Sequence, residues 1–131
     1  MQKTISMTIL AFALLSSAAN AQDMTGAEVT ALIKGKTAYL NLPGAGPRGT
    51  GAAVIFYADD NTAAAKFPNG TSPKGTWSIK GNEVCIAWAD QPNNPCSTYV
   101  KAGDKINIMS GQPKQMRATI ERLSPGNAEK L

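Results

Sequence analysis

Apolar and polar residues alternate along most of the chain beyond residue 35, with the period of two that is typical of β-strands packed on a core. The clearest case is the stretch from Trp77 to Trp88, where apolar side chains recur at every second position on either side of Gly81-Asn82. A glycine-asparagine pair between two such runs predicts a tight β-hairpin. We therefore expect paired antiparallel strands at residues 76–80 and 83–88.

The same alternation, interrupted by glycine, proline, asparagine and aspartate, predicts six more short strands. They are expected at residues 36–42, 52–58, 63–67, 96–100, 105–109 and 115–123. No segment long enough for a helix separates these strands, which argues against a parallel sheet. The predicted fold is mainly β, a small antiparallel meander or an eight-stranded barrel-like domain. The last residues, 124–131, are expected to fray.

One short helix is expected to precede the strands. Thr25 and Glu28 have the spacing of a capping box, and the apolar residues at positions 29, 32 and 33 form a single stripe. Gly35 is placed to end the helix. A helix of about ten residues is marginal alone, so we expect it to lie on an apolar surface of the domain.

The first residues have the features of a secretory signal peptide. The charge of Lys3 is followed by a mostly apolar run from Ile5 to Leu15, and Ala19-Asn20-Ala21 offers a small-residue cleavage site. The apolar run is shorter than the ~20 residues that a membrane-spanning helix needs. We expect cleavage near Ala21, a single β-rich domain at residues 22–131 that is periplasmic or secreted, and no integral membrane segment after cleavage.

The composition excludes several classes of site. The 131 residues include no histidine, which excludes serine-histidine-aspartate and cysteine-histidine catalysis and histidine-ligated metals. The net charge of +4 arises mainly from lysines spread along the sequence, whereas a nucleic-acid-binding surface gathers its cations on one face. We therefore expect a monomer that is not an enzyme and has no cofactor, no metal and no nucleic-acid partner.

The two cysteines, Cys85 and Cys96, are expected to form a disulfide. Export would place them in an oxidising compartment, and their spacing fits no zinc or haem motif. A disulfide between them closes a loop of about 12 residues. On the chain-entropy model it should stabilise the fold by about 3 kcal/mol. We expect the bridge to be structural, because the chain lacks the C-x-x-C arrangement of redox-active pairs.

Four residues are candidates for ligand contact. Trp77, Trp88 and Tyr99 lie on predicted strands, where they would line a pocket if the barrel is hollow or form the core if it is packed. Arg48 lies in the glycine-rich loop 44–49, where its cation would be available to an anion. The letters of that loop match a dinucleotide-binding motif, but a strand follows it where the motif requires a helix. We therefore interpret the loop as a flexible connection.

The motif Gly75-x-Trp77-x-Ile79, followed by Cys85-Ile86, Cys96-x-x-x-Val100 and Gly103-Asp104, resembles a group of small uncharacterised periplasmic proteins from Gram-negative bacteria. The resemblance also includes Leu32-x-x-Gly35-Lys36-Thr37 and spans most of the chain after the signal peptide. It implies a small barrel-like fold and brings no established activity. More faintly, the segment from the tryptophan to the second cysteine resembles periplasmic inhibitors of secreted metalloproteases, which are eight-stranded barrels with one disulfide.

These observations favour a non-catalytic module that binds a small molecule or an envelope protein. A protease-inhibitor-like protein and a structural or assembly factor of the cell envelope are the alternatives. A binding module predicts a sizeable apolar pocket lined by Trp77, Trp88 or Tyr99, and a fully packed barrel would count against it.

Overall fold

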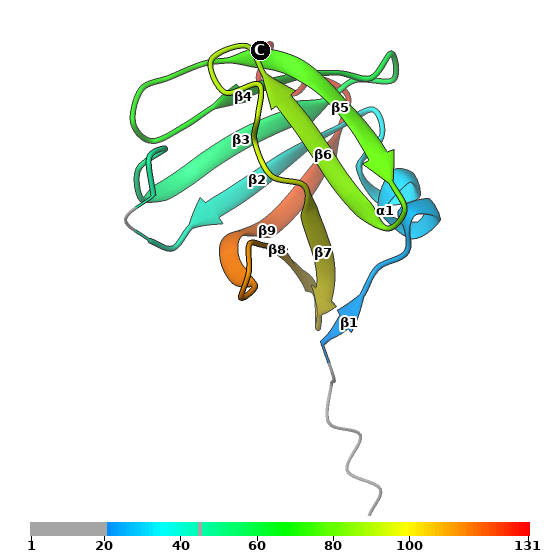
Figure 1. The fold of residues 1–131 in the computed structure, drawn as a ribbon. Coiled ribbons are helices and arrows are strands. Elements are labelled where there is room, and N and C mark those ends of the chain that lie inside the picture. The colour runs from blue at the N-terminus through cyan, green and yellow to red at the C-terminus, as the bar shows by residue number, and fades with distance from the viewer. Residues whose placement is uncertain (1–20, 45) are drawn as a thin grey trace, which may run out of the picture.

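The chain forms a barrel of antiparallel strands with a helix at one end (Figure 1). The structure is a computed structural model that describes residues 21–44 and 46–131, so the predicted signal peptide lies outside the described residues except for Ala21. The elements in chain order are β1 (Gln22–Asp23), α1 (Gly26–Ile33), β2 (Lys36–Leu42), β3 (Gly51–Tyr57), β4 (Thr62–Lys66), β5 (Lys74–Lys80), β6 (Glu83–Trp88), β7 (Ser97–Ala102), β8 (Lys105–Ser110) and β9 (Gln115–Pro125).

Strands β2 to β9 close on themselves. Each pairs antiparallel with the next along the chain, and β9 returns to pair with β2 from Lys36–Pro125 to Asn41–Thr119. This confirms the predicted mainly β fold as an up-and-down barrel of eight strands. The predicted hairpin is also present, with Lys80 opposite Glu83 and Gly81 at a φ of 61° in the turn.

The short strand β1, which the alternation does not predict, extends the sheet beside β7. Gln22 lies opposite Lys101 and Asp23 opposite Val100. Strand β6 contacts β7 only near Thr98 and Ser97, so β1 takes up the part of the β7 edge that lies beyond β6 (Figure 1). Backbone groups that would otherwise be unpaired are thereby satisfied.

Helix α1 plugs one end of the barrel. Its capping box forms as predicted, with Thr25 Oγ1 accepting from the Glu28 amide at 3.2 Å and Glu28 Oε1 accepting from the Thr25 amide at 3.1 Å. Val29 and Ile33 are fully buried and belong to the same apolar core as the strands. This short helix therefore gains its stability from the barrel. No helix in residues 21–44 and 46–131 is long and apolar enough to cross a bilayer.

The C-terminal residues are held against β2. The expectation that residues 124–131 fray was therefore wrong. Thr37 Oγ1 donates to the Gly126 carbonyl at 2.6 Å and accepts from the Ala128 amide at 3.0 Å. Tyr39, also on β2, donates to the Glu129 carboxylate. Thr37 is fully buried, and a buried hydroxyl needs such partners. The tail supplies them and so becomes part of the fold.

Candidate functional site

A cavity of about 870 Å³ opens at the end of the barrel opposite α1. In an up-and-down barrel alternate connections lie at the same end, and here the four that surround the opening are residues 43–50, 67–73, 89–96 and 111–114. We call this end the mouth. The cavity is lined by residues of all but the last of these four connections, among them Arg48, Phe67 and Pro95, and by the adjoining strand ends.

The wall of the cavity consists mainly of inward-facing apolar side chains, because one face of each strand points into the barrel. These side chains come from β2, β3 and β6 to β9, and they are Leu40, Leu42, Ile55, Val84, Ile86, Trp88, Tyr99, Ile108 and Ala118. Exposure falls from 44% at Met116 in the mouth to 1% at Tyr99. The lining therefore extends from an exposed rim at Met116 to fully buried side chains such as Tyr99.

Two of the predicted ligand-contact residues, Trp88 and Tyr99, line this cavity. The ring of Trp88 packs edge-on against Phe67, with the centroids 5.8 Å apart. The guanidinium of Arg48 in turn lies 4.6 Å above the centroid of Phe67. Arg48, Phe67 and Trp88 thus form a continuous row of contacts along one side of the mouth. Aromatic edge-to-face and cation–π attraction favour this row.

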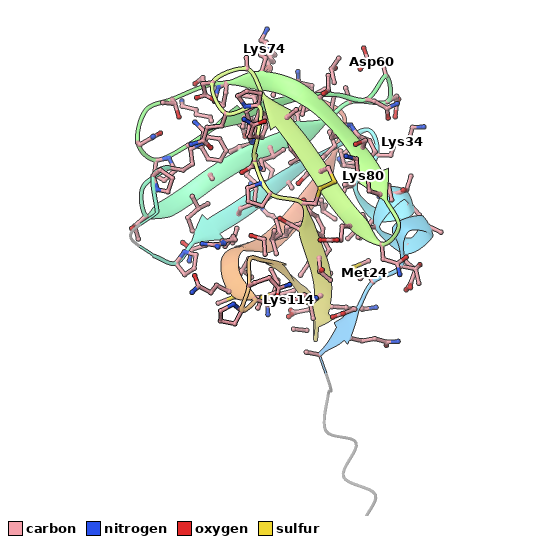
Figure 2. The ribbon with its side chains drawn as sticks, in the orientation of Figure 1. Met24, Lys34, Asp60, Lys74, Lys80 and Lys114 are labelled. Carbon is pink, nitrogen blue, oxygen red and sulfur yellow. A yellow bond between two sulfur atoms is a disulfide. The ribbon has the colours of Figure 1, made fainter. Side chains whose placement is uncertain are left out.

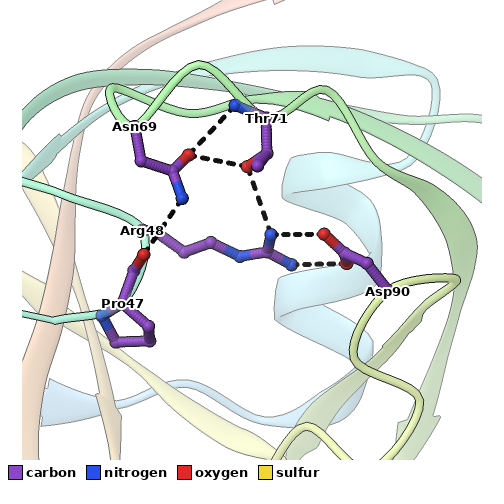
Figure 3. Close-up of polar contacts among 5 residues, drawn as sticks. All are labelled: Pro47, Arg48, Asn69, Thr71 and Asp90. Atoms are coloured by element: carbon purple, nitrogen blue, oxygen red, sulfur yellow. Dashed lines mark hydrogen bonds and ion pairs between the residues drawn. The ribbon is translucent and has the colours of Figure 1, made fainter.

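Arg48, the predicted anion contact, also lines the cavity, but its charge is already paired. Its two terminal nitrogens donate to the Asp90 carboxylate at 2.7 and 2.8 Å, and one of them also donates to Thr71 Oγ1 at 3.2 Å (Figure 3). This bond from Arg48 lowers the pKa of the Asp90 carboxyl. The bidentate pair ties the 43–50 connection to the 89–96 connection.

A second set of bonds ties the 43–50 connection to the turn between β4 and β5. Asn69 Nδ2 donates to the Pro47 carbonyl at 3.0 Å (Figure 3). The backbone amide of Asn69 donates to the Arg48 carbonyl, also at 3.0 Å. Asn69 Oδ1 accepts from Thr71 Oγ1 at 2.7 Å. The glycine-rich loop was expected to be a flexible connection, but hydrogen bonds with residues remote in sequence hold its residues Pro47 and Arg48.

Cys85 and Cys96 are joined as expected, with Sγ atoms 2.01 Å apart and Cα atoms 4.2 Å apart (Figure 2, yellow bond). They continue the β6–β7 register directly beyond the pair Val84–Ser97, where the backbone ladder of the described strands ends. From this point the 89–96 connection leaves the wall of the barrel and passes over the mouth. The disulfide therefore anchors the C-terminal end of this connection, at Cys96, to β6.

Trp77 lies elsewhere and is not among the residues lining the cavity. Its indole Nε1 donates to the Ala58 carbonyl at 3.0 Å, and its ring packs edge-on against Tyr57 with centroids 5.8 Å apart. Trp77 is 3% exposed and belongs to the closed half of the barrel near α1. The period-two pattern identified it as inward-facing but did not show at which depth of the barrel it lies.

The sequence reasoning missed a second arginine in the mouth. Arg117 lines the cavity, and its Nε donates to Ser110 Oγ at 2.9 Å. Simple alternation places residue 117 on the outer face of β9, because Ala118 and Ile120 face the core. Only a break in the strand register brings it to the mouth, and no sequence signal marked that break.

The chain matches no family model, no curated protein and no solved structure. The resemblance to small periplasmic proteins and to metalloprotease inhibitors therefore stays a prediction from the motifs.

Proposed function

We propose that this protein binds a small, largely apolar molecule inside the barrel. The observation that carries the proposal is the cavity of about 870 Å³, which is open at the mouth and walled by apolar side chains. This volume is typical of sites that take one small organic ligand, for which volumes of roughly 300–1,000 Å³ are common. Removal of apolar ligand surface from water would supply the main driving force, about 25 cal/mol per Å².

The mouth is built in a way that suits binding. Arg48 and Asp90 join two of its connections, and the Cys85–Cys96 disulfide anchors one of them to β6. Helix α1 closes the other end with Val29 and Ile33. A site held in shape before the ligand arrives loses less conformational entropy on binding.

The chemistry of the lining favours binding over catalysis. Among the described residues, those that line the cavity include no carboxylate, lysine or cysteine, and the sequence has no histidine. The hydroxyls of Ser97, Ser110 and Tyr99 line it, but a hydroxyl nucleophile needs an adjacent general base, and the described lining residues supply no carboxylate, lysine or histidine for that role. We therefore propose a non-catalytic carrier or sensor.

We further propose that the protein works outside the cytoplasm. The Lys3–Ala21 pattern supports export, and an exported chain whose two cysteines pair with each other fits an oxidising compartment. Intact-mass measurement on protein from fractionated cells tests this, since cleavage near Ala21 leaves a chain that begins near Gln22.

Binding can be tested with N-phenylnaphthylamine, a neutral apolar fluorophore. We expect saturable binding with one site per chain. Ala118→Leu adds bulk inside the cavity and should weaken this binding at least tenfold, whereas Ala52→Leu, on the outer face of β3, should not. An absence of binding, or equal loss in both variants, would overturn the proposal.

The two tryptophans provide a second measurement that needs no bulky variant. A brominated fatty alcohol quenches indole fluorescence only at short range. It should quench Trp88 in the Trp77→Phe protein much more strongly than Trp77 in the Trp88→Phe protein, because only Trp88 lines the cavity. Equal quenching of both would place the ligand outside the cavity and contradict the proposal.

A further inference from the structure

A β-bulge turns Arg117 toward the mouth. In the pairing of β8 with β9, Ile108 lies opposite Ala118 but Met109 lies opposite Met116, so Arg117 is an extra residue in the ladder. Such a bulge redirects the side chain that it carries. The four consecutive residues Gln115 to Ala118 all line the cavity at this irregular end of β9, and Arg117 is the charged one among them.

The guanidinium of Arg117 is held through its Nε atom and rests against the turn that begins at Gly111. Its Nε donates to Oγ of Ser110, which is only 6% exposed, and a terminal nitrogen lies over Gly111, where a Cβ would approach it to 2.9 Å. Gly111 also has a φ of 94°, a backbone conformation that side chains disfavour. The missing side chain of Gly111 thus leaves room for the Arg117 guanidinium, and the bond to Ser110 orients it.

The charge of Arg117 is not paired with any carboxylate of the described residues. Within residues 21–44 and 46–131 the ion pairs involve Arg48, Lys105 and Lys114, and none involves Arg117. Arg48, by contrast, is neutralised by Asp90. The terminal nitrogens of Arg117 make no hydrogen bond to any described residue. The mouth therefore presents one cation with free donors above an apolar cavity.

We propose that Arg117 receives the carboxylate of the bound molecule, so the ligand is a small amphipathic carboxylic acid with its apolar part inside the barrel. This inference rests on the proposed function. The planar fork of arginine fits a carboxylate with two parallel hydrogen bonds. A carboxylate at the rim keeps contact with water, which avoids the high cost of burying a charge in the apolar interior. Ser110 acts as a positioning residue, because its hydroxyl accepts from Nε of Arg117 and so orients the guanidinium.

The test compares laurate with lauryl alcohol, which share one alkyl chain and differ in the head group. Each is titrated as a competitor of N-phenylnaphthylamine on the processed full chain. We expect laurate to bind more tightly than lauryl alcohol. Arg117→Gln should weaken laurate about tenfold, the loss typical of a hydrogen-bonded charge, and leave lauryl alcohol unchanged.

Arg122→Gln is the matched control. Arg122 is on the same strand and carries the same charge, but its guanidinium lies over the ring of Tyr39, outside the cavity. The Arg122→Gln variant should bind laurate and lauryl alcohol with unchanged affinities. Ser110→Ala should lower laurate affinity by less than Arg117→Gln and leave lauryl alcohol unchanged.

The outcomes separate this inference from the proposed function. If N-phenylnaphthylamine and lauryl alcohol do not bind, the binding function itself is wrong. If they bind but laurate has no advantage, or if Arg117→Gln and Arg122→Gln affect laurate equally, the barrel is a binding site and the acid-binding role of Arg117 is overturned. Retained binding of lauryl alcohol by each variant shows that it is folded.

Discussion

The hydroxyl oxygens of Tyr57 and Tyr99 lie 2.6 Å apart in the buried core of the barrel. Both side chains are almost fully buried, and burial raises the pKa of Tyr57 to about 12 and that of Tyr99 well above its ordinary range. The two hydroxyls carry two protons, and their mutual bond uses one of them. The pair is a polar contact in a mainly apolar core, where a hydrogen bond is stronger than in water.

The tyrosine pair predicts loss of stability at high pH. An unfolded chain releases the Tyr57 proton near pH 10.0, whereas the folded chain holds it until about pH 12. The stabilisation is therefore complete below pH 10.0 and is lost as the pH rises through 12, by about 2 kcal/mol from Tyr57 at that pH. Urea unfolding measured across this range, alongside tyrosinate absorbance, checks the slope.

Tyr57→Phe serves as the comparison. It should lower the free energy of unfolding at neutral pH by about 1–3 kcal/mol, because the buried Tyr99 hydroxyl loses its partner, and it should reduce the alkaline slope. If all three tyrosines ionise near pH 10.0 while the circular dichroism of the folded protein is unchanged, the buried pair described here is contradicted.

Loss of the disulfide should destabilise the protein. Replacing Cys85 and Cys96 together by alanine should lower the free energy of unfolding by about 3 kcal/mol, since the unfolded chain regains the freedom of the closed loop. Urea unfolding of the native protein and of the double variant, with and without reductant, provides the measurement. In reductant the two proteins should have similar free energies of unfolding. A native protein whose stability does not respond to reductant would argue against the bridge.

Gly75→Ala should lower the free energy of unfolding by about 1–3 kcal/mol, the range typical of overpacking. A Cβ at this position on β5 would lie 2.1 Å from the Ala87 carbonyl oxygen, which is backbone and cannot move aside. Gly44→Ala is the control, because a Cβ there has no atom of another residue within 4 Å. Thermal unfolding of the two variants should therefore differ, and equal stability would show that β5 and β6 are not so close.

The Arg48–Asp90 pair predicts a specific change in carboxyl titration. Asp90 should titrate below the ordinary aspartate range, and Arg48→Gln should return its pKa toward the ordinary value. Asp60 is an internal control, because Thr62 lowers its pKa through hydrogen bonds and Arg48 is not involved. Carboxyl-carbon NMR resolves the groups, and an unchanged Asp90 pKa in the variant would show that the pair does not form in solution.

Local chemistry let the sequence predict most of the fold. Thr25 and Glu28 mark the helix start, and Gly81-Asn82 marks a two-residue hairpin. Strand bounds differ from the prediction by one or two residues, as at β3, because hydrogen-bond registers and not single residues set them. The tail was misjudged because its order depends on Thr37, a partner some ninety residues away.

The candidate site, like the fold, was predictable from the sequence only in part. From the sequence alone come the inward direction of Trp88 and Tyr99 and the pairing of the two cysteines, since these follow from a period of two and from the expected compartment. Tertiary structure alone decided that the barrel is hollow at the mouth, that Arg48 is neutralised by Asp90, and that Arg117 faces the cavity. The reason is physical: side-chain alternation acts between neighbours, whereas closure of the barrel and a bulge in one ladder depend on strands that meet only in the folded chain.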